Sequence, residues 1–189
     1  APVSAVLAGP GVGNRVFQSF ERAAAAYSTF SENALAMTAA LGTLEITREE
    51  GLCEHALRNG HRLGDLLQGL CARYPLAGRA RGRGMMRGLE LDAQTQGRVH
   101  AALGAALDPG LFAQGVLIPL FRDHQILAQV AAPRSKLIKF LPPLNLSAED
   151  FDWTERGLND ALKQASRFPG PLWRSLLGLA GATVGGATR

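Results

Sequence analysis

The chain has 189 residues, of which 47% are hydrophobic, and a formal net charge of +4. A chain of this length can bury a core, and its apolar content argues against intrinsic disorder. The positive excess is too small to indicate a nucleic-acid-binding protein by itself. Because no apolar run reaches membrane-spanning length and no signal-peptide pattern is present, we expect a cytoplasmic protein without a membrane partner.

The two cysteines, Cys53 and Cys71, lie 18 residues apart in one predicted helix. This spacing separates them by about 27 Å along the axis, too far for a disulfide. Free thiols are typical of a reducing compartment. His55 and His61 lie six positions apart and do not share a helix face, so we expect no metal site here.

The first residues contain two short segments with different patterns. Residues 3–8 form an apolar run that predicts a buried strand. The glycine-rich segment 9–13 lacks the Gly-x-Gly-x-x-Gly order of a phosphate-binding loop and is predicted to be a turn. A short helix is expected over residues 17–26.

A continuous helical pattern follows the hydroxyl-bearing residues after Tyr27. Ser31 is placed to cap this helix, and Glu32 adds a negative charge to its first turn. One apolar face is formed by Met37, Ala40, Leu41 and Leu44. The many alanines permit close packing on more than one side, so we expect the helix to run between two layers of structure.

A second helix is predicted over about residues 49–73. The sequence Thr-Arg-Glu-Glu at 47–50 has the form of a capping box that would begin it. Its buried stripe is predicted to contain Leu52, Ala56, Leu63, Leu66, Leu67 and Leu70. Gly60, Gly64 and Gly69 weaken the helix by up to ~1 kcal/mol each relative to alanine.

The pattern then changes to strands. Residues 79–91 predict two strands with a bulge. Arg79, Arg81 and Arg83 would share one strand face, but no aromatic residues alternate with them to stack on bases. We therefore expect no nucleic-acid binding.

The remaining elements are shorter. A helix is predicted over residues 98–112, and residues 114–119 predict a glycine turn into a short strand. Further strands are predicted at 126–130 and 137–141. A last helix, capped by the segment 147–150, runs to about residue 166. The order of elements indicates an α+β fold with a small mixed or antiparallel sheet. The apolar, glycine-rich tail 168–189 is too short to span a bilayer, and we expect a loosely packed end.

Two segments carry a resemblance to a known family. Residues 28–36, Ser-Thr-Phe-Ser-Glu-Asn-Ala-Leu-Ala, resemble the Ser/Gly-Thr-Phe-x-x-Asn-x-Leu-Ala segment of class III aminotransferases, which are pyridoxal-phosphate enzymes of fold type I. Residues 79–91 are similar to the Val-Arg-Gly-x-Gly-Leu-Met-x-Gly-Ile-Glu-Leu strand that opens the small C-terminal domain of that family. The resemblance covers roughly residues 2–165.

The resemblance implies a domain organisation. Residues 1–30 would be the end of the large cofactor-binding domain, with the last strand of that domain at their start. Residues 31–50 would be the interdomain helix, 51–167 the small domain and 168–189 a tail. In the family, the segment similar to residues 2–7 follows shortly after the lysine that forms the Schiff base with pyridoxal phosphate. That lysine would therefore lie upstream of this chain, in which no lysine occurs before Lys136.

The resemblance also implies site residues. Thr29, with Ser28, would reach the cofactor phosphate of the neighbouring subunit in a homodimer, whereas from spacing alone the two hydroxyls would simply cap a helix.

Lys139 stands where members of the family that act on amino acids usually have an arginine. Lysine offers a point charge instead of the fork with which arginine binds a carboxylate. The sequence therefore does not identify the substrate. Alternatively, Lys139 is an exposed lysine that discourages sheet-edge pairing. His124 is interpreted as a loop histidine.

The activity implied is transfer of an amino group from an amine or amino acid to a 2-oxo acid, with pyridoxal 5'-phosphate as cofactor. No independent catalysis is expected from residues 1–189, because the Schiff-base lysine is missing. The alternative from another class is a non-catalytic, aminotransferase-like interaction domain. A basic nucleic-acid-binding module is a third possibility, whose affinity would fall steeply with salt.

Overall fold

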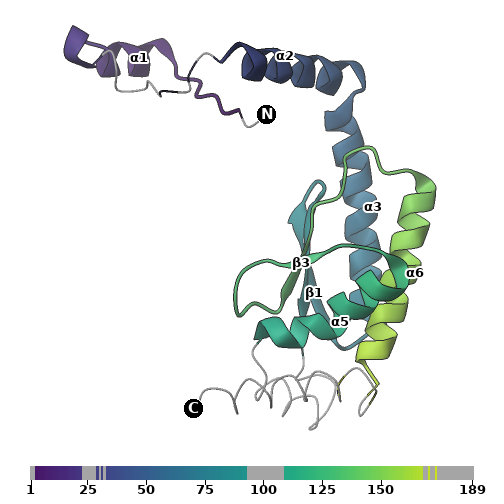
Figure 1. Cartoon of the computed structure of the whole chain (residues 1–189). Helices are drawn as coiled ribbons and strands as arrows, with labels where there is room; N and C mark the ends of the chain where they lie inside the picture. The colour runs from purple at the N-terminus through teal and green to yellow at the C-terminus, as the bar shows by residue number, and fades with distance from the viewer. Residues whose placement is uncertain are drawn as a thin grey trace, which may run out of the picture. The chain divides into compact units, whose positions relative to one another are not determined.

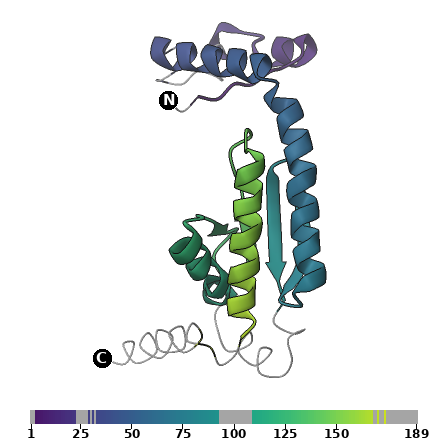
Figure 2. The ribbon, with the colours of Figure 1, turned by 90° about the vertical axis from the view of Figure 1, so that its right-hand side faces the viewer.

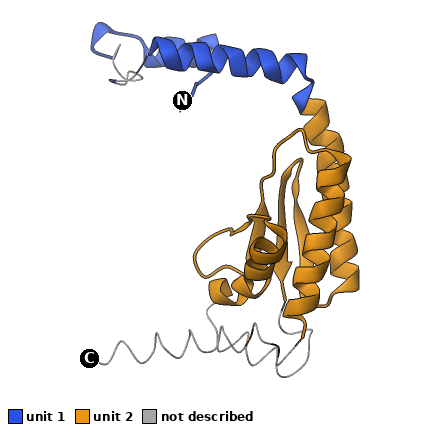
Figure 3. Ribbon diagram, turned by 45° about the vertical axis from the view of Figure 1, so that its right-hand side comes forward, with its two compact units in different colours: residues 1–52 blue, residues 53–189 orange. Residues whose placement is uncertain are grey.

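The computed structural model describes residues 3–22, 29, 31, 33–92, 109–167, 170 and 173. The chain divides into two compact units, Ala1–Leu52 and Cys53–Arg189, coloured blue and orange in Figure 3. Among the described residues, no helix combines the length and the apolar character needed to cross a membrane.

The first unit begins with exposed chain. Residues 3–9 form no helix or strand, and Leu7 is 97% exposed. The prediction of a buried strand at 3–8 is therefore wrong, because no described strand pairs with this segment and satisfies its backbone. Helix α1 (Pro10–Val16) replaces the predicted turn. Its proline lies in the first turn, where a missing N–H breaks no helical hydrogen bond. A single 3₁₀ turn at 20–22 is the only part of the predicted helix 17–26 that the described residues show.

Helix α2 (Ala34–Glu49) is capped by Asn33 and not, as predicted, by Ser31. The Asn33 side-chain oxygen accepts a hydrogen bond from the backbone N–H of Ala36 at 3.0 Å, which satisfies one of the free donors at the helix start. No residue of α2 is buried, and Leu44 is 67% exposed. The expected two covering layers are not found among the described residues.

The junction between α2 and α3 (Leu52–Arg73) differs from the predicted capping box. Thr47 lies inside α2, and its hydroxyl donates a hydrogen bond to the carbonyl of Thr43 at 2.6 Å. The chain turns at Gly51, whose φ is +59°, a conformation that glycine adopts without strain. The prediction failed because a threonine hydroxyl can bond back to its own helix as readily as it caps the next one.

The second unit is built on a four-stranded antiparallel sheet (Figure 1). Its strands are β1 (Ala77–Arg83), β2 (Met86–Leu91), β3 (Gln129–Val130) and β4 (Leu137–Phe140), in the spatial order β1-β2-β4-β3. A tight turn at Gly84 joins β1 to β2 where the bulge was predicted, and a register shift lies instead at the start of β1, between Ala77 and Arg79. This arrangement confirms the α+β class with a small antiparallel sheet.

Helices α3, α5 (Pro109–His124) and α6 (Ala148–Ala165) share one core with the sheet (Figures 1 and 2). Helices α3 and α6 lie side by side, joined by hydrogen bonds from Arg73 and Tyr74 to the side chain of Asn159. The sheet contributes Leu89, Leu91, Ile138 and Phe140 to this core; α3 contributes Leu63, Leu67 and Leu70, and α6 contributes Phe151, Leu158 and Leu162. One sheet face is therefore covered by helices.

Helix α6 begins as predicted. Ser147 is its N-cap, and a capping box pairs Ser147 with Asp150 in both directions.

Helix α5, by contrast, lies where a strand within residues 114–119 was predicted, so that prediction is wrong. The predicted helix 98–112 falls mostly outside the described residues. Nearly the whole central part of α5 is buried, which removes the one-sided apolar pattern that would have marked a helix.

Trp173 completes the core. Its ring packs against Phe112 with centroids 5.4 Å apart, and its indole N–H donates a hydrogen bond to the carbonyl of Ala165 at 2.8 Å. The ring is fully buried. A residue of the segment predicted to be loosely packed therefore belongs to the core of the second unit.

Candidate functional site

Lys139 lies in β4 and projects to the sheet face opposite the helices. Ile138 and Phe140, its neighbours in sequence, are buried in the core, and side chains alternate along a strand. Lys139 pairs with Gly88 of β2 on one side and with Gln129 of β3 on the other. Its side chain is half-buried, and among the described residues it has no ion-pair partner. This is the position of a cation available to a ligand.

The face that carries Lys139 is called here the open sheet face. Its residues are Arg79, Arg81 and Arg83 of β1, Met86, Gly88 and Glu90 of β2, Leu137 and Lys139 of β4, and Leu141. The predicted sharing of one face by the three arginines is confirmed by their pairing with alternate residues of β2. The face is basic, with apolar side chains between the charges.

One carboxylate on this face lies near the arginines. The guanidinium of Arg81 and the carboxylate of Glu90 are 3.5 Å apart, and the two side chains are 51% and 44% exposed. Exposed pairs of this kind contribute about 0–1 kcal/mol. The pair therefore leaves Arg81 able to exchange Glu90 for another anion.

Arg87 points the other way, toward α3. Its guanidinium donates hydrogen bonds to the carbonyl oxygens of Gly84 at 3.0 Å, Gly82 at 3.0 Å and Gly60 at 2.6 Å. A Cβ on Gly64 would come within 3.0 Å of the same guanidinium. Arg87 thus fixes the β1–β2 turn against α3 and sets the position of the strand beside Lys139. Sequence reasoning missed this role, although two glycines one helical turn apart were a signal of close approach.

Thr29 lies in the first unit, in an exposed turn that precedes the N-cap Asn33 of α2 in the sequence. Ser28 lies outside the described residues. Because Thr29 and Lys139 belong to different units, the structure does not test whether they serve one site. Their roles stay predictions.

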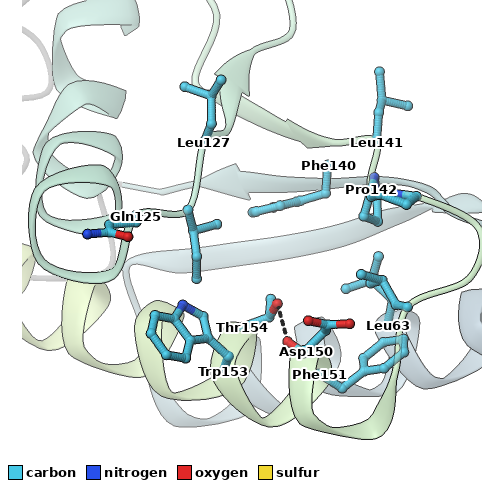
Figure 4. A pocket seen from close by; sticks show the side chains of 13 residues that line it. Leu63, Gln125, Leu127, Phe140, Leu141, Pro142, Asp150, Phe151, Trp153 and Thr154 are labelled. Atoms are coloured by element: carbon cyan, nitrogen blue, oxygen red, sulfur yellow. Dashed lines mark hydrogen bonds between the residues drawn. The ribbon is translucent and has the colours of Figure 1, made fainter.

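A cavity lies on the helix side of the sheet (Figure 4). This cavity of about 400 Å³ is bounded by the residues after α5, the end of β4 and the first turns of α6. Figure 4 shows Phe140, Trp153 and Phe151 on its walls, with the Asp150 carboxylate among them. Hydrogen bonds from the backbone N–H and hydroxyl of Ser147 hold the pKa of Asp150 below its usual range. The cavity suits an apolar group, and the carboxylate of Asp150 is already engaged in capping α6.

His124 ends α5 and does not lie in a loop as predicted. Its Nε2 lies 3.4 Å from a carboxylate oxygen of Asp160, and its carbonyl accepts a hydrogen bond from the Trp153 indole at 2.8 Å. These contacts tie α5 to α6. The histidine is thus a packing residue at a helix end.

Cys53 and Cys71 both lie in α3 and are free, as the sequence predicted. In the part of the chain that the structure describes, no three His, Cys, Asp or Glu side chains are grouped to hold a metal ion.

Similarity to known proteins identifies the class of protein. The family model for "Aminotransferase class-III" matches residues 2–162, and the chain belongs to this family. Diaminobutyrate–2-oxoglutarate transaminase of Halomonas elongata is 30% identical over 176 residues, covering 88% of this chain and 35% of that protein. Acetylornithine aminotransferase of Thermosynechococcus vestitus is 35% identical over 148 residues, covering 78% and 31%.

A solved structure gives the same result. The amine transaminase of an uncultivated Pseudomonas species, in its pyridoxal-phosphate-bound form, superposes with a TM-score of 0.63 at 28% identity. The match covers 78% of this chain and 31% of that one. This chain thus spans about a third of the length of the curated relatives it matches.

The family implies pyridoxal phosphate, and the described residues fit only part of that cofactor. Thr29 offers an exposed hydroxyl of the kind that binds a phosphate. The chain has three lysines, of which Lys136 lies over the Phe112 ring and Lys139 lies on the open sheet face. No catalytic step through the cofactor is therefore assigned to this chain.

Proposed function

We propose that this chain is the C-terminal portion of a pyridoxal-phosphate-dependent class III aminotransferase, which moves an amino group from an amine or amino acid to a 2-oxo acid. The observation that carries the proposal is Lys139, a half-buried cation on the open sheet face of a chain that belongs to this family. The relatives' names support the reaction type, since they include diaminobutyrate and acetylornithine as amino donors.

In this proposal, the chain's own residues hold substrate and cofactor and do not perform the proton transfers. Lys139 attracts an acidic group of the substrate, while Leu137 and Leu141 on the same face exclude water around that charge. Thr29 donates a hydrogen bond to the cofactor phosphate of the partner subunit in a homodimer. The lysine that binds the cofactor aldehyde belongs to the part of the protein upstream of this chain.

The test compares two polypeptides, the 189-residue chain and the longer polypeptide that contains it. Amino transfer from a panel of amines and amino acids to 2-oxo acids is measured with added pyridoxal phosphate. We expect activity from the longer polypeptide only. Activity of the 189-residue chain alone, or no transfer by the longer one with any donor, would contradict the proposal.

Lys139 is tested in the longer polypeptide. Lys139→Gln removes the charge and should raise KM for acidic substrates about tenfold, as expected for one charged contact of about 1.4 kcal/mol. Lys139→Arg keeps the charge and is the matched control. An equal rise in KM for an amine without an acidic group would show that Lys139 serves the structure and not the substrate.

The second candidate is a non-catalytic interaction domain, which the exposed apolar residues of α2 favour. Leu35, Leu41 and Leu44 are all exposed, as on a helix that packs against another chain or segment. The visible absorbance of bound pyridoxal phosphate separates the two functions. A longer polypeptide that binds a protein partner but never acquires this absorbance would be an interaction domain.

A further inference from the structure

The cavity on the helix side of the sheet has one charged group on otherwise uncharged, mostly apolar walls (Figure 4). Its volume of about 400 Å³ is enough for a small organic molecule. Among the described residues that line it, only Asp150 is charged, and the rings of Phe140, Phe151 and Trp153 form part of the wall. In Figure 4, Trp153 and Asp150 of α6 lie across this space from Phe140 of β4. Aromatic rings beside one negative charge are suited to an organic cation.

Capping of α6 uses only one oxygen of the Asp150 carboxylate. The backbone N–H and the hydroxyl of Ser147 both donate to Oδ2, at 2.9 and 2.8 Å, and no described residue donates a hydrogen bond to Oδ1. The first turn of α6 contains Glu149 and Asp150 and no basic residue. Their two charges outweigh the roughly half a unit of positive charge at a helix N-terminus. This end of the cavity is therefore negative.

A neighbouring contact already places a cation on an aromatic ring of α6. The guanidinium of Arg62 lies 4.4 Å from the centroid of the Phe151 ring and 3.3 Å from the carboxylate of Asp152. Asp152 thus balances the charge of Arg62, which does not line the cavity. Among the described residues, no cation lies over the rings of Trp153 or Phe140. These two rings remain available to a cation that a ligand brings.

The walls of the cavity favour methyl groups over N–H donors. The indole N–H of Trp153 donates to the carbonyl of His124 at 2.8 Å, which holds the ring in place. Pro142 and Pro143, whose φ angles are fixed by their rings, add C–H surface. A primary ammonium group needs acceptors for three N–H donors, whereas the methyl groups of a quaternary ammonium pack against C–H and ring surfaces.

We propose that this cavity binds a quaternary ammonium compound with a small apolar body. Asp150 opposes the charge of the ligand, and Trp153 and Phe140 contact its methyl groups. The inference is independent of the proposed function, because a nitrogen with four carbon substituents has no N–H and cannot donate an amino group. The cavity also lies on the helix side of the sheet, whereas Lys139 projects to the open sheet face.

The probes are choline and 3,3-dimethylbutan-1-ol, which have the same shape and differ in that a carbon atom replaces the charged nitrogen. Each is titrated into the 189-residue chain at low ionic strength, and binding is followed by calorimetry and by the NMR signal of the Trp153 indole. We expect choline to bind about tenfold more tightly than the alcohol and to shift that signal. Equal affinity for the two probes, or no binding of choline, would overturn the inference. Binding of butylammonium as tight as that of choline would overturn the preference for a quaternary nitrogen.

Four variants, each checked for folding by circular dichroism, assign the binding to this cavity. Asp150→Asn removes the charge and should bring the affinity for choline close to that for the alcohol, and Trp153→Leu should weaken choline more than the alcohol. Glu149→Gln is the matched control, because Glu149 lies in the same helical turn and does not line the cavity. Ser147→Ala removes the cap but leaves the charge of Asp150, so choline binding should be retained. Equal losses in Asp150→Asn and Glu149→Gln would overturn the inference in favour of diffuse negative charge. A loss in Ser147→Ala as large as in Asp150→Asn would show that Asp150 acts only through the fold.

Discussion

The guanidinium of Arg87 donates a hydrogen bond to the backbone carbonyl of Gly60 at 2.6 Å, joining strand β2 to the middle of helix α3. The contact depends on Gly60 having no side chain, because a Cβ there would lie 2.4 Å from the carbonyl carbon of Gly84. The turn between β1 and β2 therefore rests directly on the helix backbone. Strand β2 in turn carries Gly88, which lies between Arg81 of β1 and Lys139 of β4.

Gly60→Ala is predicted to destabilise the protein by about 1–3 kcal/mol, the usual cost of forcing extra atoms into a packed contact. Chemical denaturation measures the change. Gly69→Ala is the control, because Gly69 lies in the same helix with nothing within 4 Å of a built Cβ. That substitution should stabilise the helix by up to ~1 kcal/mol. The same sign for both substitutions would show that helix propensity, and not the contact with Gly84, decides the effect.

Arg87→Met is predicted to destabilise the protein by about 2–3 kcal/mol, because three backbone carbonyls lose a charged donor. Arg87→Lys should recover little of this loss, since an ammonium cannot donate in the fork geometry of a guanidinium. Arg83→Gln, an exposed change on the neighbouring strand, should stay within about 0.5 kcal/mol. Thermal unfolding of the three variants is the measurement. Wild-type stability in Arg87→Lys would contradict the conclusion that the geometry of the guanidinium is needed for these hydrogen bonds.

The elements that the sequence predicted well depend on local signals. The capping residues Ser147 and Asp150 mark the start of α6, and the leucines at 63, 67 and 70 mark the buried face of α3. The position of Lys139 on its strand follows from alternation with the buried Ile138. In each case the residues that decide the structure lie within a few positions of one another.

The predictions that failed depend on contacts between residues distant in sequence, or on surroundings that hide the hydrophobic periodicity of an element. Helix α5 is buried over most of its centre, so its apolar run from Phe112 to Leu120 has no exposed polar side that would reveal a helical period. Arg87 finds the carbonyl of Gly60 27 positions earlier, and no local pattern encodes that pairing. Trp173 stands in an apolar tail whose composition does not distinguish a docked residue from an exposed one.

Trp173→Ala is predicted to cost about 3–5 kcal/mol, the range for removing a large buried aromatic side chain. The loss includes the ring contact with Phe112 and the hydrogen bond to the carbonyl of Ala165. Trp153→Ala is the matched control, because the Trp153 ring is half exposed and should cost clearly less. Urea unfolding of both variants decides the matter. Equal costs would mean that residue 173 does not dock in the core.

The last prediction concerns acid stability and the carboxylate of Asp123. Hydrogen bonds from Arg122 and Gln164 lower the pKa of Asp123 to about 2. A group whose pKa is lower in the folded than in the unfolded protein stabilises the fold while it is ionised, and this stabilisation is lost as it is protonated. The contribution of Asp123 should therefore be fully present above the unfolded pKa of 3.8 and decline as the pH falls from there to about 2.

Asp123→Asn tests this, because an amide cannot titrate. The difference in stability between the wild type and Asp123→Asn should shrink as the pH is lowered through that window. Arg122→Gln removes the main cause of the lowered pKa, so in that background the same comparison should show a smaller pH dependence. Denaturation midpoints measured at several pH values between about 2 and 6 give both curves. A difference between wild type and Asp123→Asn that stays constant down to pH ~2 would mean that the contact with Arg122 does not persist in solution, as can occur for exposed ion pairs.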